Sequence, residues 1–180
     1  MKRRNRLRVG LAQPVKMYLR KIPLNRGRGF VYRQILRRIL PPAPESFAAR
    51  RPGGSFVTLQ FREVLGLSAF VTGGFEDAEC RLLMAITRPD SVAIDVGANV
   101  GIHTIPIAAS APLARVLAIE PLPGNAARLR ENADANSIEN IDVIEVAVGS
   151  QEGVVTLHIA DDPAYASTDG VLRGQREMVR

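Results

Sequence analysis

The chain has 180 residues, enough for one hydrophobic core, and its 46% hydrophobic and 23% charged residues are ordinary for a globular domain. No apolar run of about 18 residues or more predicts a membrane span, and the single cysteine, Cys80, excludes an intramolecular disulfide. Nothing at the N-terminus has the apolar centre of a secretory signal, so a cytoplasmic location is expected.

The net charge of +6 is unevenly distributed along the chain. Residues 1–51 hold 15 Lys or Arg and one acid, a net charge of +14, whereas residues 52–180 hold 9 Lys or Arg and 17 acids, a net charge of −8. Within this basic head, residues 29–40 place apolar side chains on one face of a predicted helix and arginines off it. Such a helix fits a membrane surface contacted through residues 1–40, RNA binding, an organelle presequence, or a cap on the acidic body. No pattern of interleaved aromatics favours nucleic acid, so no nucleic-acid partner is expected.

Short elements are predicted between the head and the middle of the chain. The prolines and glycines of residues 41–54 indicate a linker. Residues 55–61 and 67–72 alternate apolar and polar side chains, which predicts a β-hairpin with its turn at residues 62–66. Residues 75–87 have helical apolar spacing, so we expect a helix there, beside the first strand of the following sheet.

The stretch 91–104, SVAIDVGANVGIHT, is typical of a nucleotide-binding turn. Its residues 92–96 are a nearly unbroken apolar run, which predicts a parallel strand buried on both faces. Gly97 and Gly101 then allow a sharp bend or a close approach of the backbone to a ligand. Asp95 interrupts the apolar run and needs hydrogen-bond donors or a cationic group nearby. The dinucleotide pattern GxGxxG is not present.

A second acid follows the next predicted strand. The run 115–120, RVLAIE, ends in Glu120, 25 positions after Asp95. In a strand–helix–strand unit this position suits a carboxylate that accepts both hydroxyls of a ribose. The alternative is an ordinary solvated acid at the end of a strand.

The remaining pattern completes an α/β unit. Pro106 is comfortable only in the first turn of a helix, so the helix after the glycine turn either starts near His103 or is bent at the proline. A second helix is predicted at residues 124–135, and strands are predicted at residues 141–148 and 154–160. Three strands alternating with two helices predict a parallel sheet.

These residues resemble a known family. DVGANVGIHT, followed by AIEPLPGNAARLRENADANSIENIDVIEVAVGSQEG, is similar to the FkbM family of S-adenosylmethionine-dependent methyltransferases, from about residue 74 to 153. The similar features include the acidic glycine turn, the Glu-Pro after the second strand, the pair Glu131 and Asn132, and the Val-Gly after the third strand. The resemblance implies S-adenosylmethionine as cofactor, with its methionine part held by Asp95, Gly97, Asn99 and Gly101, its ribose by Glu120 and its adenine near Ala147.

Two further residues have more than one interpretation. In the family an acid follows a Gly-aromatic pair, so Glu76 either lines the cofactor pocket or only stabilises the start of a helix. His103 either sits over the cofactor or only begins its helix. The other histidine, His158, falls in an alternating strand, and no serine or cysteine stands in a motif beside either. Metal, catalytic-triad and thiol chemistry are unsupported, and no catalytic base is assigned.

The fold class expected is α/β, an incomplete Rossmann-like class I methyltransferase sheet at residues 91–180. It is preceded by the hairpin and helix at residues 55–90 and by the basic head and linker at residues 1–54. The family continues with at least four more strands, but residues 161–180 show no further buried strand. We therefore expect a truncated reading frame or a fragment, and an open edge beside residues 92–96.

The function expected is methyl transfer from S-adenosylmethionine to a hydroxyl of a small molecule or glycan. One alternative is a truncated, non-catalytic remnant that binds a membrane or another subunit through its basic head. A nicotinamide oxidoreductase comes third, because the GxGxxG spacing is absent.

Overall fold

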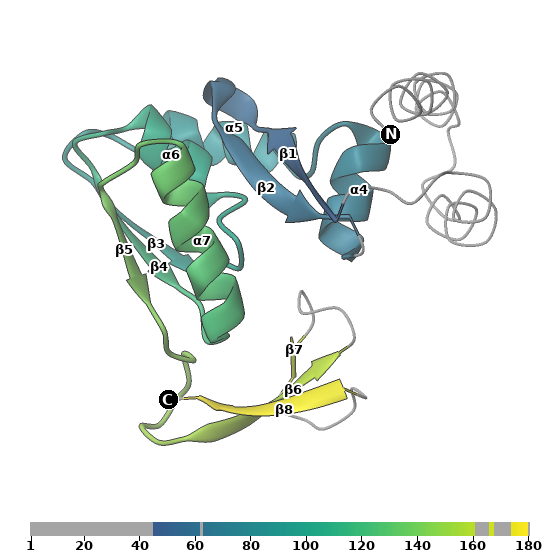
Figure 1. Cartoon of the computed structure of the whole chain (residues 1–180). Helices are drawn as coiled ribbons and strands as arrows, with labels where there is room; N and C mark the ends of the chain where they lie inside the picture. Colours follow the sequence, from purple (N-terminus) through teal and green to yellow (C-terminus); the bar gives the residue numbers. More distant parts are fainter. Residues whose placement is uncertain (1–44, 62, 161–165, 168–173, 180) are drawn as a thin grey trace, which may run out of the picture.

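The computed structural model describes residues 45–61, 63–160, 166–167 and 174–179 (Figure 1). The predicted head helix at residues 29–40 lies outside the described residues. In chain order the elements are β1 (Ser46–Arg50), the 3-10 turn η2 (Pro52–Gly54), β2 (Phe56–Gln60), α4 (Val64–Thr72), α5 (Asp77–Ile86), β3 (Val92–Val96), α6 (Thr104–Ser110), β4 (Arg115–Ile119), α7 (Pro123–Ala135), β5 (Ile141–Ile144), β6 (Val155–Ala160), β7 (Ala166–Ser167) and β8 (Gly174–Val179).

A parallel sheet in the order β3-β4-β5 forms the centre of the described chain. Helix α6 joins β3 to β4, and α7 joins β4 to β5. Both helices cover the same face, since Val116 packs against Ile107 of α6 and Ala118 against Leu129 of α7. This β-α-β-α-β arrangement is one half of a doubly wound sheet, so the predicted, incomplete Rossmann-like fold class is confirmed.

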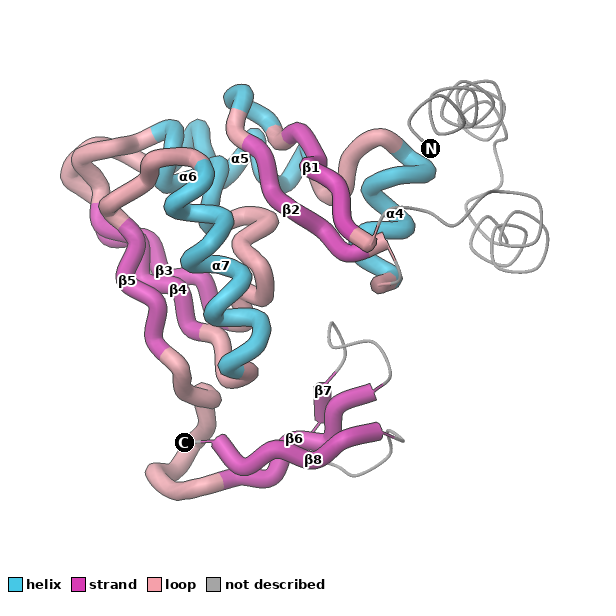
Figure 2. The backbone as a smooth tube through the Cα atoms, viewed as in Figure 1, coloured by secondary structure: helices cyan, strands magenta, loops and turns pink. Residues whose placement is uncertain are grey.

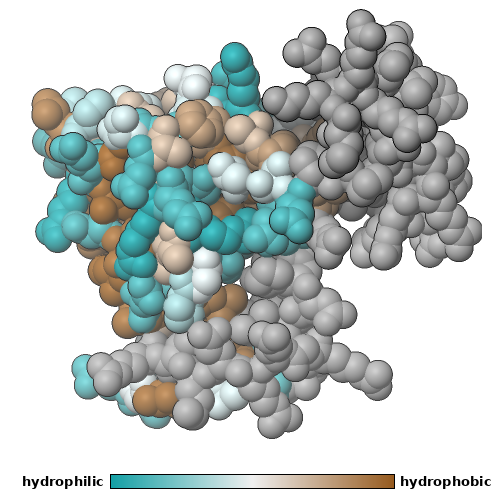
Figure 3. Space-filling view, viewed as in Figure 1, coloured by the Kyte–Doolittle hydropathy of each residue, from teal (hydrophilic) through white to brown (hydrophobic). Residues whose placement is uncertain are grey.

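The opposite face of this sheet carries an apolar surface. The side chains of Val92, Ile94 and Val96 are 60%, 61% and 60% exposed, so the prediction that β3 is buried on both faces is wrong. No described element covers this face, and within the described ranges β3 pairs with β4 alone. Figure 3 shows hydrophobic surface along the left margin, where Figure 1 places this sheet. The other edge of β3 is open in this part of the chain, as expected.

The hairpin uses different strands from those predicted. β1 lies within the stretch predicted to be linker and pairs antiparallel with β2, with Phe47 opposite Leu59. The predicted second strand, residues 67–72, is instead part of helix α4, which ends at Gly73 with φ 83°. Leu65 and Ala69, four residues apart, are both buried, as on one face of a helix. The apolar spacing in this short run fits the two-residue period of a strand as well as the 3.6-residue period of a helix. The helix forms because it buries its apolar face against β2.

Two asparagines attach α7 to the hairpin. The amide oxygen of Asn136 accepts the N–H of Phe56 at 3.0 Å, and its Nδ2 donates to the carbonyl of the same residue at 2.8 Å. One turn earlier, the oxygen of Asn132 accepts the N–H of Thr58 at 2.9 Å. These side chains satisfy the edge of β2 that β1 leaves unpaired, so α7 lies between the hairpin and the parallel sheet (Figure 2).

Asn132 also reaches the glycine turn. Its side chain is fully buried, and its Nδ2 donates to the carbonyl of Val100 at 2.8 Å. The bidentate ion pair of Arg128 with Glu63, at 2.6 and 3.1 Å, adds a second link between α7 and the segment after β2. The hairpin is therefore fixed to the α/β unit by polar groups with defined directions.

The C-terminal strands form a separate antiparallel sheet. β6 confirms the strand predicted at residues 154–160, and it pairs with β7 on one side and with β8 on the other. β8 lies in the stretch in which no further buried strand was expected. Leu157 of β6 packs against Leu122 and Ala147, which connects this sheet to the α/β unit.

Replacing Asn132 with alanine is expected to lower the free energy of unfolding by about 2 to 4 kcal/mol, because each buried group left without a partner costs about 1 to 3 kcal/mol. The groups concerned are the N–H of Thr58 and the carbonyl of Val100. Urea denaturation measures the change. The matched control is Glu131→Ala, an exposed neighbour on the same helix, which should change stability by less than about 0.5 kcal/mol. Equal losses in the two variants would contradict the bridging role.

Amide hydrogen exchange along β3 is expected to alternate. The carbonyl of Ser91 accepts the N–H of Arg115, and the N–H of Gly97 donates to the carbonyl of Ile119. In a parallel pair this pattern directs the N–H groups of Ala93 and Asp95 toward β4 and those of the exposed valines and isoleucine toward the open edge. The amides of Ala93 and Asp95 should be protected, and those at 92, 94 and 96 should exchange rapidly. Equal protection along the strand would show that another segment pairs with this edge.

Candidate functional site

The glycine turn follows β3 at the carboxyl edge of the sheet. Gly97, Asn99 and Gly101 have φ angles of 83°, 50° and 90°, a region that glycine enters freely and that asparagine tolerates better than most residues. A side chain at Gly97 would meet no atom within 4 Å, so the backbone there faces open space. A Cβ at Gly101 would come within 2.9 Å of Ile105, so this glycine allows α6 to pack closely. The turn thus has one face open to a ligand and one packed on the core.

Glu120 lies beside this turn. Its carboxylate is 5% exposed and accepts the N–H of Asn99 at 2.9 Å and the N–H of Leu122 at 3.1 Å. Asn125 Nδ2 donates to the same carboxylate at 3.3 Å. The structure therefore brings together two predicted site residues, Asn99 and Glu120, that are 21 positions apart. The alternative of a solvated acid at the strand end does not hold, because this side chain is buried and bonded.

Asp95 is held by the helix that follows the turn. The hydroxyl of Thr104, which is fully buried, donates to Asp95 Oδ2 at 2.5 Å. Asp95 and His103 together line a cavity of about 320 Å³ whose other walls are largely apolar side chains of α5, β3 and α6. The sequence analysis did not identify Thr104 as a partner of Asp95. Its position directly after His103, in the first turn of α6, could have indicated that role.

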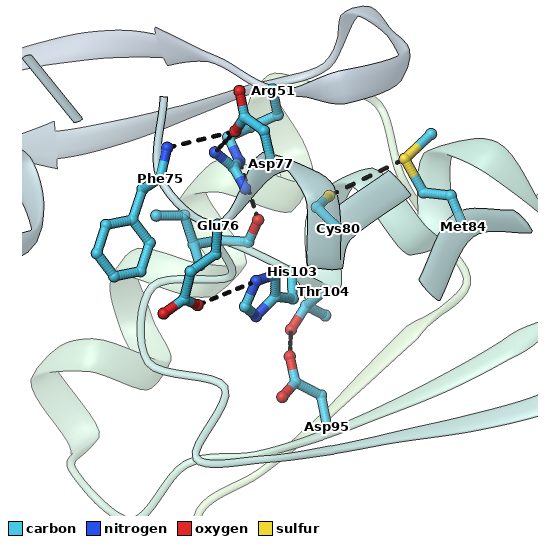
Figure 4. A network of polar contacts seen from close by, with 10 residues as sticks. Arg51, Phe75, Glu76, Asp77, Cys80, Met84, Asp95, His103 and Thr104 are labelled. Carbon is cyan, nitrogen blue, oxygen red and sulfur yellow. Dashed lines mark hydrogen bonds and ion pairs between the residues drawn. The ribbon is translucent and has the colours of Figure 1, made fainter. Parts of the chain in front are cut away.

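Glu76 comes from a different part of the chain and meets the start of α6. Its Oε2 lies 3.4 Å from Nε2 of His103, the residue that precedes α6 (Figure 4). Glu76 itself has φ 50°, and it precedes α5 without capping that helix through its side chain. It also lines a second, open pocket of about 450 Å³ formed by residues 68 and 73–77. Both interpretations of Glu76 given above agree with its position before α5.

A buried arginine fixes the residue after Glu76. Arg51, in the hairpin turn, donates from Nη1 to Asp77 Oδ1 at 2.8 Å and from Nε to the carbonyl of Ile102 at 3.1 Å (Figure 4). Cys80 lies in the same network and is fully buried. Burial raises the pKa of the Cys80 thiol, although the nearby Arg51 opposes this effect, so the thiol is a poor nucleophile near neutral pH.

Ala147 follows β5, the third strand of the parallel sheet. It packs partly buried against Leu122, two residues after Glu120, and against Leu157 of β6. The carboxyl edge of the sheet thus carries most of the predicted residues: those of the glycine turn, Glu120 and Ala147. Glu76 comes instead from the loop before α5. Asn125 and Leu122, which the sequence analysis did not identify, complete the surroundings of Glu120.

Within the described ranges, no group of three or more His, Cys, Asp or Glu side chains is placed to hold a metal ion. Among the same residues, no helix combines the length and apolar character needed to cross a membrane.

Solved structures with a similar arrangement include two proteins called TYW2. The M. jannaschii TYW2 crystal structure, in complex with AdoMet, is 23% identical with a TM-score of 0.49, and the match covers 58% of this chain and 45% of that chain. The P. horikoshii TYW2 crystal structure, in complex with MeSAdo, is 20% identical with a TM-score of 0.48, and the match covers 60% of this chain and 38% of that chain.

The sequence of this chain is similar to one curated relative and to one family of domains. The AMB antimetabolite synthetase AmbE of Pseudomonas aeruginosa is 33% identical over 101 residues, which are 53% of this chain. The match spans 5% of the length of that relative. Residues 95–177 match the methyltransferase FkbM domain. This segment begins at Asp95 and includes the glycine turn, Glu120 and Ala147, and it belongs to the FkbM family of methyltransferase domains.

Proposed function

We propose that this chain binds S-adenosylmethionine at the carboxyl edge of its parallel sheet and transfers the methyl group to an acceptor. The observation that carries the proposal is the contact of Glu120 with Asn99. It joins the acid after the second strand to the turn after the first, which is where α/β sheets of this kind bind nucleotides. The match of residues 95–177 to a methyltransferase domain supports the same ligand class.

The residues present fit the chemistry of this ligand. Asp95 and Glu76 offer carboxylates suited to the ammonium of the methionine part, and the backbone at Gly97 faces open space. Glu120 still has acceptor capacity for ribose hydroxyls, since a carboxylate has about four lone-pair sites and three protein donors reach it. Ala147, which is partly buried, offers an apolar side chain suited to adenine. Gly101 shapes the turn by allowing α6 to pack closely.

The acceptor we propose is a hydroxyl of a small molecule or glycan. When bound, S-adenosylmethionine supplies an activated methyl group that an acceptor oxygen displaces directly. The contribution of the protein is then mainly to hold the two reacting atoms in line and to exclude water. The chain's own task is orientation, for which the buried Glu120 and Thr104 provide rigid supports.

The variant Glu120→Ala is expected to weaken S-adenosylmethionine binding on the order of tenfold to a hundredfold, because hydrogen bonds to a charged group contribute about 1.5 to 3 kcal/mol each. Titration calorimetry with S-adenosylmethionine measures the change. The thermal stability of the same variant should also be measured, because Glu120 accepts the N–H groups of Asn99 and Leu122 and its loss can weaken the fold itself.

Two controls separate binding from folding. Glu131→Ala removes an exposed acid of α7 and should leave the affinity unchanged. Asn125→Ala removes one neutral partner of the Glu120 carboxylate and should have a smaller effect than loss of the carboxylate. Equal affinity in Glu120→Ala and the unmodified chain, or tighter binding of NAD than of S-adenosylmethionine, would refute the proposed function.

A further inference from the structure

Glu76 and His103 meet although they are 27 positions apart, and neither is used in the ribose and adenine contacts proposed above. The carboxylate comes from the loop before α5, and the imidazole stands at the start of α6. Their nearest atoms, Oε2 and Nε2, are 3.4 Å apart. Nε2 is buried and makes no hydrogen bond within the described part of the chain, and the carboxylate of Glu76 lies near enough to accept one after a small adjustment of the two side chains.

The backbone of Glu76 is held in a costly conformation. Its φ and ψ of 50° and 41° lie in the left-handed region, which costs a residue other than glycine about 1 to 3 kcal/mol and persists where the surroundings impose it. Glu76 stands at the N-cap position of α5 but makes no side-chain hydrogen bond to that helix. Figure 4 shows its side chain turned toward His103 instead. The strain therefore orients a carboxylate toward an imidazole.

The imidazole of His103 lies near Asp95, the acid before the glycine turn. His103 and Asp95 line the same cavity of about 320 Å³, and Thr104, the next residue, donates to Asp95. Glu76 lines the open pocket of about 450 Å³. Each member of the pair therefore lines one of the two hollows, and the 3.4 Å contact joins them.

We propose that His103 accepts the proton of the acceptor hydroxyl and that Glu76 is its positioning residue. The inference rests on the proposed function. As the acceptor oxygen bonds to the methyl carbon, the carbon–sulfur bond breaks and the sulfur keeps that electron pair. The hydroxyl proton passes to Nδ1 of His103, while Nε2–H donates to Glu76, which stabilises the imidazolium that forms.

The first test observes the pair without any ligand. The full chain contains two histidines, His103 and His158, so the spectrum of their ring nitrogens is simple and His158→Gln assigns it. A bonded Nε2–H of His103 should exchange slowly with water and give a proton signal in a nitrogen-15 spectrum. That signal should be lost in Glu76→Ala and kept in Glu76→Gln, which retains an acceptor oxygen. An equal signal in Glu76→Ala would show that Glu76 does not position the ring.

The second test uses S-adenosylmethionine labelled with carbon-13 in its methyl group. In the complex, the methyl protons should show a nuclear Overhauser effect to the ring of His103, which remains in His158→Gln and disappears in His103→Gln. A saturated complex without this contact would overturn the catalytic role of His103. Failure of the compound to bind at all would instead refute the proposed function, and the ligand-free spectrum would then report the pair as a structural contact alone.

Discussion

The arrangement of this chain depends on the hydrogen bonds of one buried amide. Asn132 satisfies the N–H of Thr58 at the free edge of the hairpin and the carbonyl of Val100 in the glycine turn. The hairpin, α7 and the turn therefore share a single polar group inside the core. A buried amide has strict directional requirements, so the three segments can approach one another in one orientation only. The part of the chain before the sheet thereby acquires a fixed position relative to the carboxyl edge.

Because the hairpin is fixed relative to the sheet, residues reach the candidate site from both. Glu120 is anchored from the sheet side by the N–H groups of Asn99 and Leu122. Glu76 is supplied from the hairpin side and meets His103 at the start of α6. The glycine turn lies between these two acids, with its open face at Gly97. In the proposed function, one of these acids faces the ammonium of the cofactor and the other accepts its ribose hydroxyls.

The α/β unit was predictable because its local signals agree. Apolar runs, the glycine turn and Pro123 mark the ends of β3, β4 and α7 to within a few residues. The hairpin was predicted from the wrong strands, since the short run 67–72 has spacing compatible with both a strand and a helix. β1 was missed because the prolines and glycines around it suggested a linker. The meeting of Glu76 with His103 and the bonds of Asn132 depend on tertiary packing between distant segments, for which a single sequence carries no local signal.

Arg51 gives the hairpin turn an influence on the site that its distance along the chain would not suggest. Its buried guanidinium holds Asp77 and the carbonyl of Ile102, the neighbours of Glu76 and His103 respectively. A purely apolar contact could slide by a fraction of an ångström, whereas a forked cation bonded to two fixed acceptors resists both sliding and rotation. One residue of the hairpin turn thus acts as a spacer that sets the separation of the loop before α5 from the start of α6. The geometry of the acid–imidazole pair therefore depends on an arginine that is bonded to the chain neighbours of both its members.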